Sequence, residues 1–330
     1  MFPTYNREGC VRAALRSVAS LNYPPDKYEV IVIDDGSNDG TERTVRLMQD
    51  GYDAKILYFR QERKGITAAR NLGIAKASGE LLIFTDDDCT FEKDWIWELL
   101  RYNDSPNVGA VGGPDKGPLD ASFFARCVDY TTTSFIGTGG VRRKAGFIVA
   151  RYYPRGCNMM VPRNVIDLVG MFDPSLEAGE EIELGYRIRK AGFKLAYAPT
   201  AMVWHKRRDN LVAFVRQMFT RGQTRIELAK RHRELLELSY FIPPVVLFCV
   251  FMLSLLLLFC PAMIQTFEVP FLVACAILLA AGTHGAIQLR DARAVGAIPL
   301  LLGLQYLMYG AGFVEALFRN RAHFLSFLSK

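Results

Sequence analysis

The stretch Leu81-Leu82-Ile83-Phe84-Thr85-Asp86-Asp87-Asp88 decides the fold of this 330-residue chain. Its four leading apolar residues predict a short buried strand, and three consecutive aspartates follow where that strand ends. A second stretch has the same plan, because the β-rich run Tyr28–Ile33 ends in Asp34-Asp35-Gly36-Ser37. Helical patterns at Val11–Leu21 and Thr41–Gln49 flank this strand. The alternation predicts an α/β domain with a mostly parallel sheet, which binds ligands at the carboxyl ends of its strands.

The three consecutive aspartates predict a metal–phosphate site. Neighbouring carboxylates repel one another unless a cation or hydrogen-bond donors offset their charge. A hard divalent cation such as Mg²⁺ takes oxygen ligands and commonly completes its shell with substrate phosphates. The sequence contains no Walker-type or GxGxxG glycine loop that would offer another phosphate cradle. We therefore expect Asp86 and Asp88 to bind a divalent metal, Mg²⁺ or Mn²⁺.

A second acidic region, Glu180-Glu181-Ile182-Glu183, precedes a predicted helix over Ile182–Ala191. Acids at this place have a structural interpretation, because negative charge near a helix N-terminus favours the helix dipole. They also have a functional interpretation, in which one carboxylate is a general base supported by Glu183 or Arg187. The sequence alone leaves both interpretations open.

Length and composition indicate two parts, of which one lies in a membrane. The length suits about two domains, and a composition of 50% hydrophobic and 22% charged residues excludes collagen-like and disordered classes. Between residues 240 and 288 only Glu268 is formally charged. Three segments fit the thickness of a bilayer, the third less apolar than the others: Tyr240–Cys260, Val269–Leu289 and Gly296–Phe318. The third segment either crosses the membrane or re-enters it.

The net charge of +6 is concentrated just before the first apolar segment. Nine Lys and Arg but only two acids lie between Lys206 and Arg233, which gives +7 there. From Asn210 the pattern predicts a helix with an apolar stripe, and a break is expected at Gly222. Such a helix suits the membrane interface and anionic lipid. Nucleic-acid binding is the rival interpretation of a basic run, but no nucleic-acid partner is expected, because the next residues enter the bilayer. Since basic flanks stay in the cytoplasm, a multi-pass protein of the cell membrane with a cytoplasmic head is expected.

Residues 1–205 resemble the family 2 glycosyltransferases, which have the GT-A fold. The matching elements appear in the order found in that family: Pro3-Thr4-Tyr5-Asn6, Asp34-Asp35-Gly36-Ser37, Lys64-Gly65 with Ala69-Arg70-Asn71-Leu72-Gly73, Asp86-Asp87-Asp88, Gly156-Cys157-Asn158, Phe172-Asp173 and Glu180-Glu181. The resemblance implies three parts: a catalytic domain over 1–209, a basic interfacial helix over 210–238, and a transmembrane domain of about three helices over 239–330.

The resemblance also implies site residues. The base and ribose of the donor would lie with Thr4, Tyr5 and Asp35. Other groups near the nucleotide sugar would be Asp34, Lys64, Arg70, Asp86 and Asp87. The metal would be bound by Asp88 with Asp86 and His205, although a structural role for His205 is nearly as well supported. Glu181 would be the catalytic base beside Glu180, and the acceptor side would carry Asn158, Arg216, Arg221 and Arg225.

The implied activity is inverting, metal-dependent transfer of a hexose from a UDP- or GDP-linked donor to a lipid-linked acceptor. Alternatives are a polyprenyl-phosphate sugar synthase, a non-catalytic membrane scaffold with a decayed head, and a phosphotransferase, because Asp86-Asp87-Asp88-Cys89-Thr90 fits a DxDxT nucleophile motif. The chain departs from the family in three ways. The first strand before Pro3 is nearly absent, Glu181 replaces the usual Asp, and the Gln-x-x-Arg-Trp motif of processive enzymes is missing.

Overall fold

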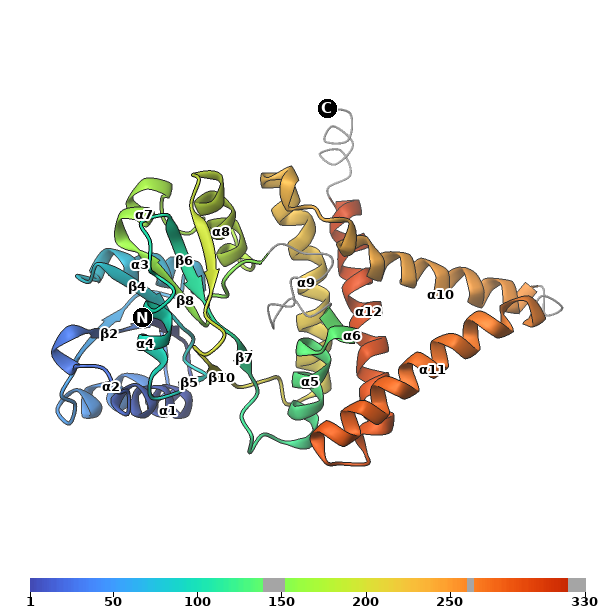
Figure 1. Ribbon diagram of the computed structural model, residues 1–330, viewed down its shortest axis with the longest axis horizontal. Coiled ribbons are helices and arrows are strands. Elements are labelled where there is room, and N and C mark those ends of the chain that lie inside the picture. The colour runs from blue at the N-terminus through green and yellow to red at the C-terminus, as the bar shows by residue number, and fades with distance from the viewer. Residues whose placement is uncertain (139–151, 260–263, 320–330) are drawn as a thin grey trace. The chain divides into compact units, whose positions relative to one another are not determined.

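The computed structural model of the chain describes residues 1–138, 152–259 and 264–319. The chain forms two compact units (Figure 1). The first contains Met1–Pro118 and Tyr152–Lys206 and is an α/β unit, and the second contains residues 119–138 and 207–319 and is helical. Residues 119–138 thus belong with the C-terminal helices, which the sequence pattern did not indicate.

The α/β unit begins with a parallel sheet in the order β1-β2-β3. Its strands are β1 (Phe2–Thr4), β2 (Glu29–Asp34) and β3 (Lys55–Arg60). The helices that follow its strands are α1 (Glu8–Ala19), α2 (Thr41–Gln49) and α3 (Ile66–Lys76), with a 3₁₀ turn at Pro25–Lys27. Residues Val30–Ile33 of β2 are all buried, as expected for a central parallel strand covered on both faces.

A second sheet has the order β4-β8-β6-β9. Its strands are β4 (Leu81–Phe84), β6 (Val108–Gly112), β8 (Met159–Pro162) and β9 (Lys194–Tyr197), and the nearby helices are α4 (Trp95–Leu100), α7 (Arg163–Val169) and α8 (Glu180–Lys190). Strand β8 runs antiparallel to β4 and β6, whereas β6 and β9 are parallel. The backbone of Met1 hydrogen-bonds to Ile83 and Thr85, so β1 and β4 are neighbours.

A third, small sheet has the order β5-β10-β7 and lies beside the aspartates that follow β4. Its strands are β5 (Cys89–Phe91), β7 (Asp115–Lys116) and β10 (Val203–His205). Strand β10 runs antiparallel to β5 and parallel to β7. The central strand therefore brings His205 between residues of two other parts of the chain.

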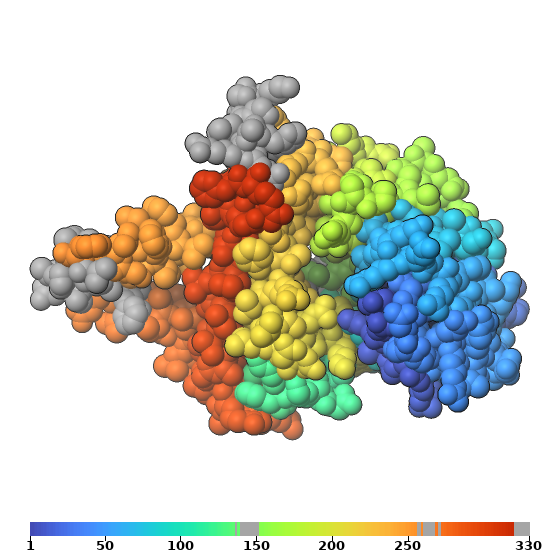
Figure 2. Space-filling view, turned by 180° about the vertical axis from the view of Figure 1, so that it is seen from behind, coloured from blue at the N-terminus to red at the C-terminus, as the bar shows by residue number. Residues whose placement is uncertain are grey.

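In the helical unit the described residues form five helices of eleven or more residues, one short helix and two 3₁₀ turns. They are α5 (Phe123–Thr133), α6 (Phe135–Thr138), α9 (Leu211–Arg231), the 3₁₀ turns Arg233–Leu235 and Leu238–Phe241, α10 (Ile242–Phe259), α11 (Ile264–Leu289) and α12 (Ala294–Arg319). Figure 2 shows α9 (yellow) packed side by side with α12 (red). A Cβ at Gly222 would lie 2.1 Å from the Tyr309 carbonyl oxygen, and one at Gly312 would lie 2.0 Å from that of Phe219. Glycine is therefore what lets these two helices approach.

Three helical segments in the described ranges are long and apolar enough to cross a membrane: Leu238–Leu255, Leu272–Leu289 and Ala294–Arg319. The third is the most buried of them, because α9 and α11 pack against α12. The predicted end of the first segment at Cys260 lies outside the described residues.

The structure confirms the predicted α/β class and strand–helix order, and it corrects two details. The predicted break at Gly222 is wrong, because α9 continues to Arg231 and Gly222 is a packing contact. The helix expected from Ile182 begins at Glu180, so both acids lie in its first turn. The first strand is short, as expected, with only Phe2 before Pro3, and Phe2 is buried.

Candidate active site

Asp34 closes strand β2 and is fully buried. Its two carboxylate oxygens accept hydrogen bonds from different partners: the backbone N–H of Ser37 at 2.7 Å and the hydroxyl of Tyr58 at 2.5 Å. Within the part of the chain that the structure describes, both of these partners are uncharged donors. Its role is therefore to fix the turn after β2, as expected for a supporting residue.

Asp35 organises the loop that follows β3. Its carboxylate accepts hydrogen bonds from the Gln61 side chain at 2.7 Å and from the backbone N–H groups of Lys64 at 2.8 Å and Gly65 at 2.9 Å. Lys64 thus contributes its backbone, and its side chain is exposed. Gly65 has a φ of 89°, which glycine adopts without strain, at the start of α3.

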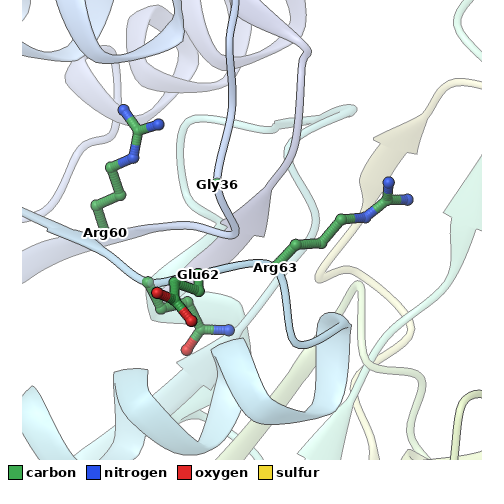
Figure 3. Close-up of a pocket in the computed structure, with 5 residues that line it drawn as sticks. Gly36, Arg60, Glu62 and Arg63 are labelled. Atoms are coloured by element: carbon green, nitrogen blue, oxygen red, sulfur yellow. The ribbon is translucent and has the colours of Figure 1, made fainter.

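A shallow pocket of about 490 Å³ lies along this loop, lined by Gly36, Arg60, Gln61, Glu62 and Arg63. In Figure 3 the side chains of Arg60 and Arg63 leave the loop in diverging directions, with Glu62 between them. The Arg63 guanidinium lies 4.0 Å from the centroid of the Tyr5 ring and donates to its hydroxyl at 3.2 Å. This pair places a cation and an aromatic face beside Asp35, as planar-ring recognition requires.

Thr4 and Arg7 bring the end of β1 to the aspartates after β4. The Thr4 hydroxyl donates to Asp87 at 2.7 Å, and Arg7 Nη1 lies 3.0 Å from Asp87 and 2.7 Å from Asp88. Burial, helped by the neighbouring charge of Asp88, raises the pKa of Asp87 to about 6. The side chain of Thr4 is therefore engaged with Asp87, whereas a role with the nucleotide base was expected.

The last aspartate of the triplet faces His205. The Nε2 atom of His205 lies 3.1 Å from Asp88 Oδ1, and its Nδ1 atom lies 3.8 Å from Oδ2 of the buried Asp115. Burial lowers the pKa of His205, but Cys157, Asp115 and Asp88 outweigh it and raise that pKa above its usual range. Burial likewise raises the pKa of Asp88, but His205 and Arg7 hold it below its usual range.

Two groups of possible metal ligands occur among the described residues: Asp88 with Cys89 and His205, and Asp115 with Cys157 and His205. Within each group the ligand atoms lie within 4.8 Å of one another. Asp86, expected to join Asp88 at the metal, is instead paired with Arg70. The structure thus brings Asp88 and His205 together as predicted and gives Asp86 a separate partner.

Arg70 is a buried cation that joins two acidic parts of the chain. Its Nη2 donates to Asp86 at 2.7 Å, and its Nη1 pairs with Glu180. A Cβ at Gly156 would lie 2.6 Å from Arg70 Nη2, so glycine makes room for the guanidinium. Burial and the charge of Glu181 raise the pKa of Glu180 to about 7, against the opposing effect of Arg70.

Glu181 follows in the first turn of α8 and is half-buried. No side chain of the described residues forms a hydrogen bond or an ion pair with it. Glu183 and Arg187, expected to support the base, pair with each other through α8 at 2.7–2.9 Å. Arg187 also donates to the Met171 carbonyl at 2.7 Å, so this pair anchors the loop before α8.

The four residues expected on the acceptor side have different environments. Asn158 is fully buried and bonds to Trp95, Pro114 and Ala201 inside the α/β unit, so its placement on the acceptor side is not supported. The other three lie on α9 of the helical unit: Arg216, Arg221 and Arg225. Arg216 is exposed, whereas the Arg225 guanidinium lies 4.4 Å from the centroid of the Tyr240 ring.

The sequence-based reasoning missed several polar partners: Arg7, Gln61, Arg63 and Asp115. Arg7 lies three residues after the end of β1, and Asp115 lies three residues after the end of β6, so closeness to a strand end was the available signal for them. Gln61 and Arg63 lie in the loop after β3, which carries no acidic motif of its own.

A family model described as Glycosyl transferase family 2 matches residues 1–165. Among curated proteins, the chain is 28% identical over 230 residues to glycosyltransferase AglE of Haloferax volcanii, which covers 69% of this chain and 72% of that protein. It is 28% identical over 256 residues to the probable glycosyltransferase YdaM of Bacillus subtilis, covering 73% and 60% of the two chains. It is 26% identical over 201 residues to the poly-beta-1,6-N-acetyl-D-glucosamine synthase of Staphylococcus aureus, covering 61% and 47%.

Among solved structures, the chain is similar to the mannosyltransferase PcManGT from Pyrobaculum calidifontis in complex with GDP-Man and Mn²⁺. The TM-score is 0.59 at 21% sequence identity, covering 96% of this chain and 86% of that chain. At this identity the likeness concerns the fold, and it confirms the predicted GT-A class.

Proposed function

The chain belongs to glycosyl transferase family 2, and from this premise we propose that it transfers a hexose from a nucleotide-sugar donor to a hydroxyl of a membrane-bound acceptor, with inversion. One observation carries the proposal: the buried Arg70 joins Asp86, after β4, to Glu180, at the start of α8. This link supports the proposal that the aspartates after β4 and the acidic pair of α8 belong to one site. Family membership removes the reason for the phosphotransferase alternative.

The donor nucleotide is proposed to bind along the loop that Asp35 holds. The Tyr5 ring and the Arg63 guanidinium offer stacking surfaces for a base. The exposed Lys64 side chain and the Arg60 and Arg63 side chains supply positive charge for a diphosphate. These contacts suit either a uridine or a guanosine diphosphate.

The residues at the triplet fit a divalent cation. Asp88 offers a hard oxygen and His205 an imidazole nitrogen, only 3.1 Å apart. The carboxylate suits Mn²⁺ or Mg²⁺, and the added imidazole favours Mn²⁺, because Mg²⁺ prefers oxygen ligands. The ion pair between Arg7 and Asp88 supports the proposal that Asp88 can pair with a positive charge. When bound, such a cation would stabilise the charge that develops on the leaving diphosphate. Asp88 and His205 are the residues proposed to hold it.

Glu181 is proposed to be the general base. Its neighbour Glu180 is buried and paired with Arg70, so Glu180 is held in place and is not free to approach an acceptor. Glu181 is half-buried and unpaired among the described side chains, so its carboxylate can take the proton of an acceptor hydroxyl. A polyprenyl-phosphate acceptor would need no base, and the presence of Glu181 modestly favours a hydroxyl.

The acceptor is proposed to be linked to a lipid, in the biosynthesis of a polysaccharide or a glycoconjugate. Three segments can cross a membrane, and the basic helix α9 directly precedes the first of them. Basic side chains such as Arg216 would attract anionic lipid at the cytoplasmic face. The α/β unit would then lie in the cytoplasm as part of a multi-pass protein of the cell membrane.

The proposal is tested by replacing Glu181 with Gln in the full-length protein. Loss of a general base costs about 10²- to 10⁴-fold in rate, so turnover should fall by about this factor while donor affinity stays unchanged. The matched control is Glu177→Gln, an exposed acid four residues away, which should keep wild-type turnover. A loss of only a few-fold in Glu181→Gln would contradict the base assignment.

Calorimetry with UDP and with GDP, each in the presence of Mn²⁺, tests the donor site and identifies its nucleotide. One of the two should bind. If neither binds to the intact wild-type protein, the non-catalytic scaffold becomes the better interpretation.

A further inference from the structure

His205 is the last residue of β10, the central strand of a small sheet, and it has two different acidic neighbours there. In β10 it lies directly opposite Cys89 of β5, and Asp88 precedes that cysteine. On the other side, Asp115 of β7 pairs with Val203. Since residues two apart in a strand share a face, Asp115 lies on the same face as His205. The order β5-β10-β7 therefore places one carboxylate on each side of the imidazole.

Each ring nitrogen faces its own carboxylate. Nε2 lies 3.1 Å from Asp88, on the side of the proposed cation site, and Nδ1 lies 3.8 Å from Asp115, on the interior side. A neutral imidazole carries a proton on only one of its nitrogens, and the other is then a lone-pair donor. Because a carboxylate faces each nitrogen, the imidazole favours a proton on both. When a cation takes the place of the proton on Nε2, the negative charge of Asp115 favours the proton that remains on Nδ1.

Asp115 is itself held in place. Its side chain is buried, and the Nε atom of Arg155 lies 3.7 Å from the oxygen that does not face His205. The result is a row of alternating charges that runs from Arg155 through Asp115, His205 and Asp88 to Arg7. A buried carboxylate is costly unless it is paired, so this row explains why an acid is tolerated at position 115.

We propose that Asp115 is a positioning residue for the cation site: its carboxylate keeps His205 in the tautomer protonated at Nδ1, so that the Nε2 lone pair faces Asp88 and the metal. The inference rests on the proposed metal site and adds to it a residue that does not touch the metal. Metal-binding histidines commonly donate their second N–H to a carboxylate in this way. Cys157 also lies near His205, but a thiol is the weaker acceptor.

This role can be tested without turnover by titrating the full-length protein with Mn²⁺. The electron paramagnetic resonance signal of the free ion measures how much Mn²⁺ is bound. Loss of a partner of a metal-binding histidine costs about 10- to 100-fold in metal affinity. Asp115→Asn should therefore weaken Mn²⁺ binding by about this factor, and Cys157→Ala should change it by less than about threefold. An unchanged affinity in Asp115→Asn, or the larger loss in Cys157→Ala, would overturn the proposal.

A double-mutant cycle separates positioning from a general effect on the fold, because residues that act through one another are not additive. If Asp115 acts through His205, then Asp115→Asn should have no further effect on Mn²⁺ affinity in a His205→Gln background. A full additional loss there would contradict the inference. If wild-type protein and Asp88→Asn both fail to bind Mn²⁺, the metal site itself is wrong, and the inference falls with it.

If Asp115→Asn fails to fold, the protonation of His205 can still be measured in the wild-type protein. The chain has only four histidines, so nitrogen NMR of histidine-labelled protein with Mg²⁺ is tractable, and His205 is assigned by the signal lost in His205→Gln. A protonated Nδ1 is expected. A proton on Nε2 would overturn the proposal.

Discussion

The two aspartate clusters at the strand ends look alike in sequence but are stabilised in different ways. Among the described residues, the side chains of Asp34 and Asp35 accept hydrogen bonds from uncharged donors alone, including the backbone N–H groups of Ser37, Lys64 and Gly65. The triplet after β4 is instead balanced by charged groups: Asp86 by Arg70, Asp87 by Arg7, and Asp88 by Arg7 and His205.

The Asp34–Asp35 cluster therefore fixes the backbone of a loop, whereas the triplet after β4 pairs with positive charges. Hydrogen bonds to backbone N–H groups fix a loop in one geometry, and here that loop borders the pocket beside Tyr5. Ion pairs can be exchanged, because another cation can replace a guanidinium or an imidazolium. We therefore expect substitutions in the two clusters to change different measured quantities.

The largest effect is expected in the charged cluster. Asp88→Asn keeps the size of the side chain but removes the charge proposed to hold the cation, so turnover should fall by about 10²- to 10³-fold, as when one electrostatic contact to the transition state is lost. Mn²⁺ affinity should fall with it, while UDP or GDP binding without metal stays the same. Asp104→Asn, at an exposed site, is the matched control. Turnover and Mn²⁺ affinity close to wild type in Asp88→Asn would contradict the proposed difference between the two clusters.

An intermediate effect is expected for Asp35→Asn. The amide has one oxygen in place of two, so an NH₂ group would face one of the backbone N–H donors, from Lys64 or Gly65. Loss of a hydrogen bond to a charged group costs about 1.5–3 kcal/mol, which corresponds to about 10- to 150-fold in nucleotide affinity. Calorimetry should show this loss with unchanged Mn²⁺ affinity. A fall in Mn²⁺ affinity as well would mean that the two clusters are one unit.

The smallest effect is expected for Tyr58→Phe, which removes one of the two donors to the buried Asp34. An unsatisfied buried acceptor costs about 1–3 kcal/mol, and this cost should appear as a lower free energy of unfolding, with turnover within twofold of wild type. All three tryptophans (Trp95, Trp97 and Trp204) lie in the α/β unit, so denaturation followed by tryptophan fluorescence reports on this unit. Tyr28→Phe serves as control, because its hydroxyl bonds only weakly to a carbonyl at 3.3 Å. A large loss of turnover in Tyr58→Phe would contradict a purely structural role for Asp34.

The features that the sequence predicted correctly depend on residues close to one another along the chain. Strand β4 and helix α2 begin and end where expected, because apolar runs and caps act over a few residues. The positions of both aspartate clusters followed from the rule for strand ends. The partners of these acids did not follow, because they come from far along the chain: Arg7 lies about 80 residues before Asp87, and Arg70 lies 110 residues before Glu180.

The helical unit shows the same limit of prediction from local sequence. The apolar stripe of α9 was visible, but the sequence could not show that α12 would cover it, so Gly222 was interpreted as a break. Asp115 was missed for a related reason. Its importance comes from the pairing of β7 with β10, two strands almost 90 residues apart in the chain. Pairing of distant segments is a property of the whole fold and leaves no local pattern.

The fit between Arg70 and Gly156 has a consequence for how such chains can diverge. A Cβ at position 156 would lie 2.6–2.8 Å from the guanidinium, and Arg70 cannot move aside because two ion pairs hold it in a buried place. A chain with any larger residue at 156 must therefore shorten residue 70 at the same time. In an alignment of descendants, these two columns should change together, and library screens that vary one position alone should recover only the parental residue.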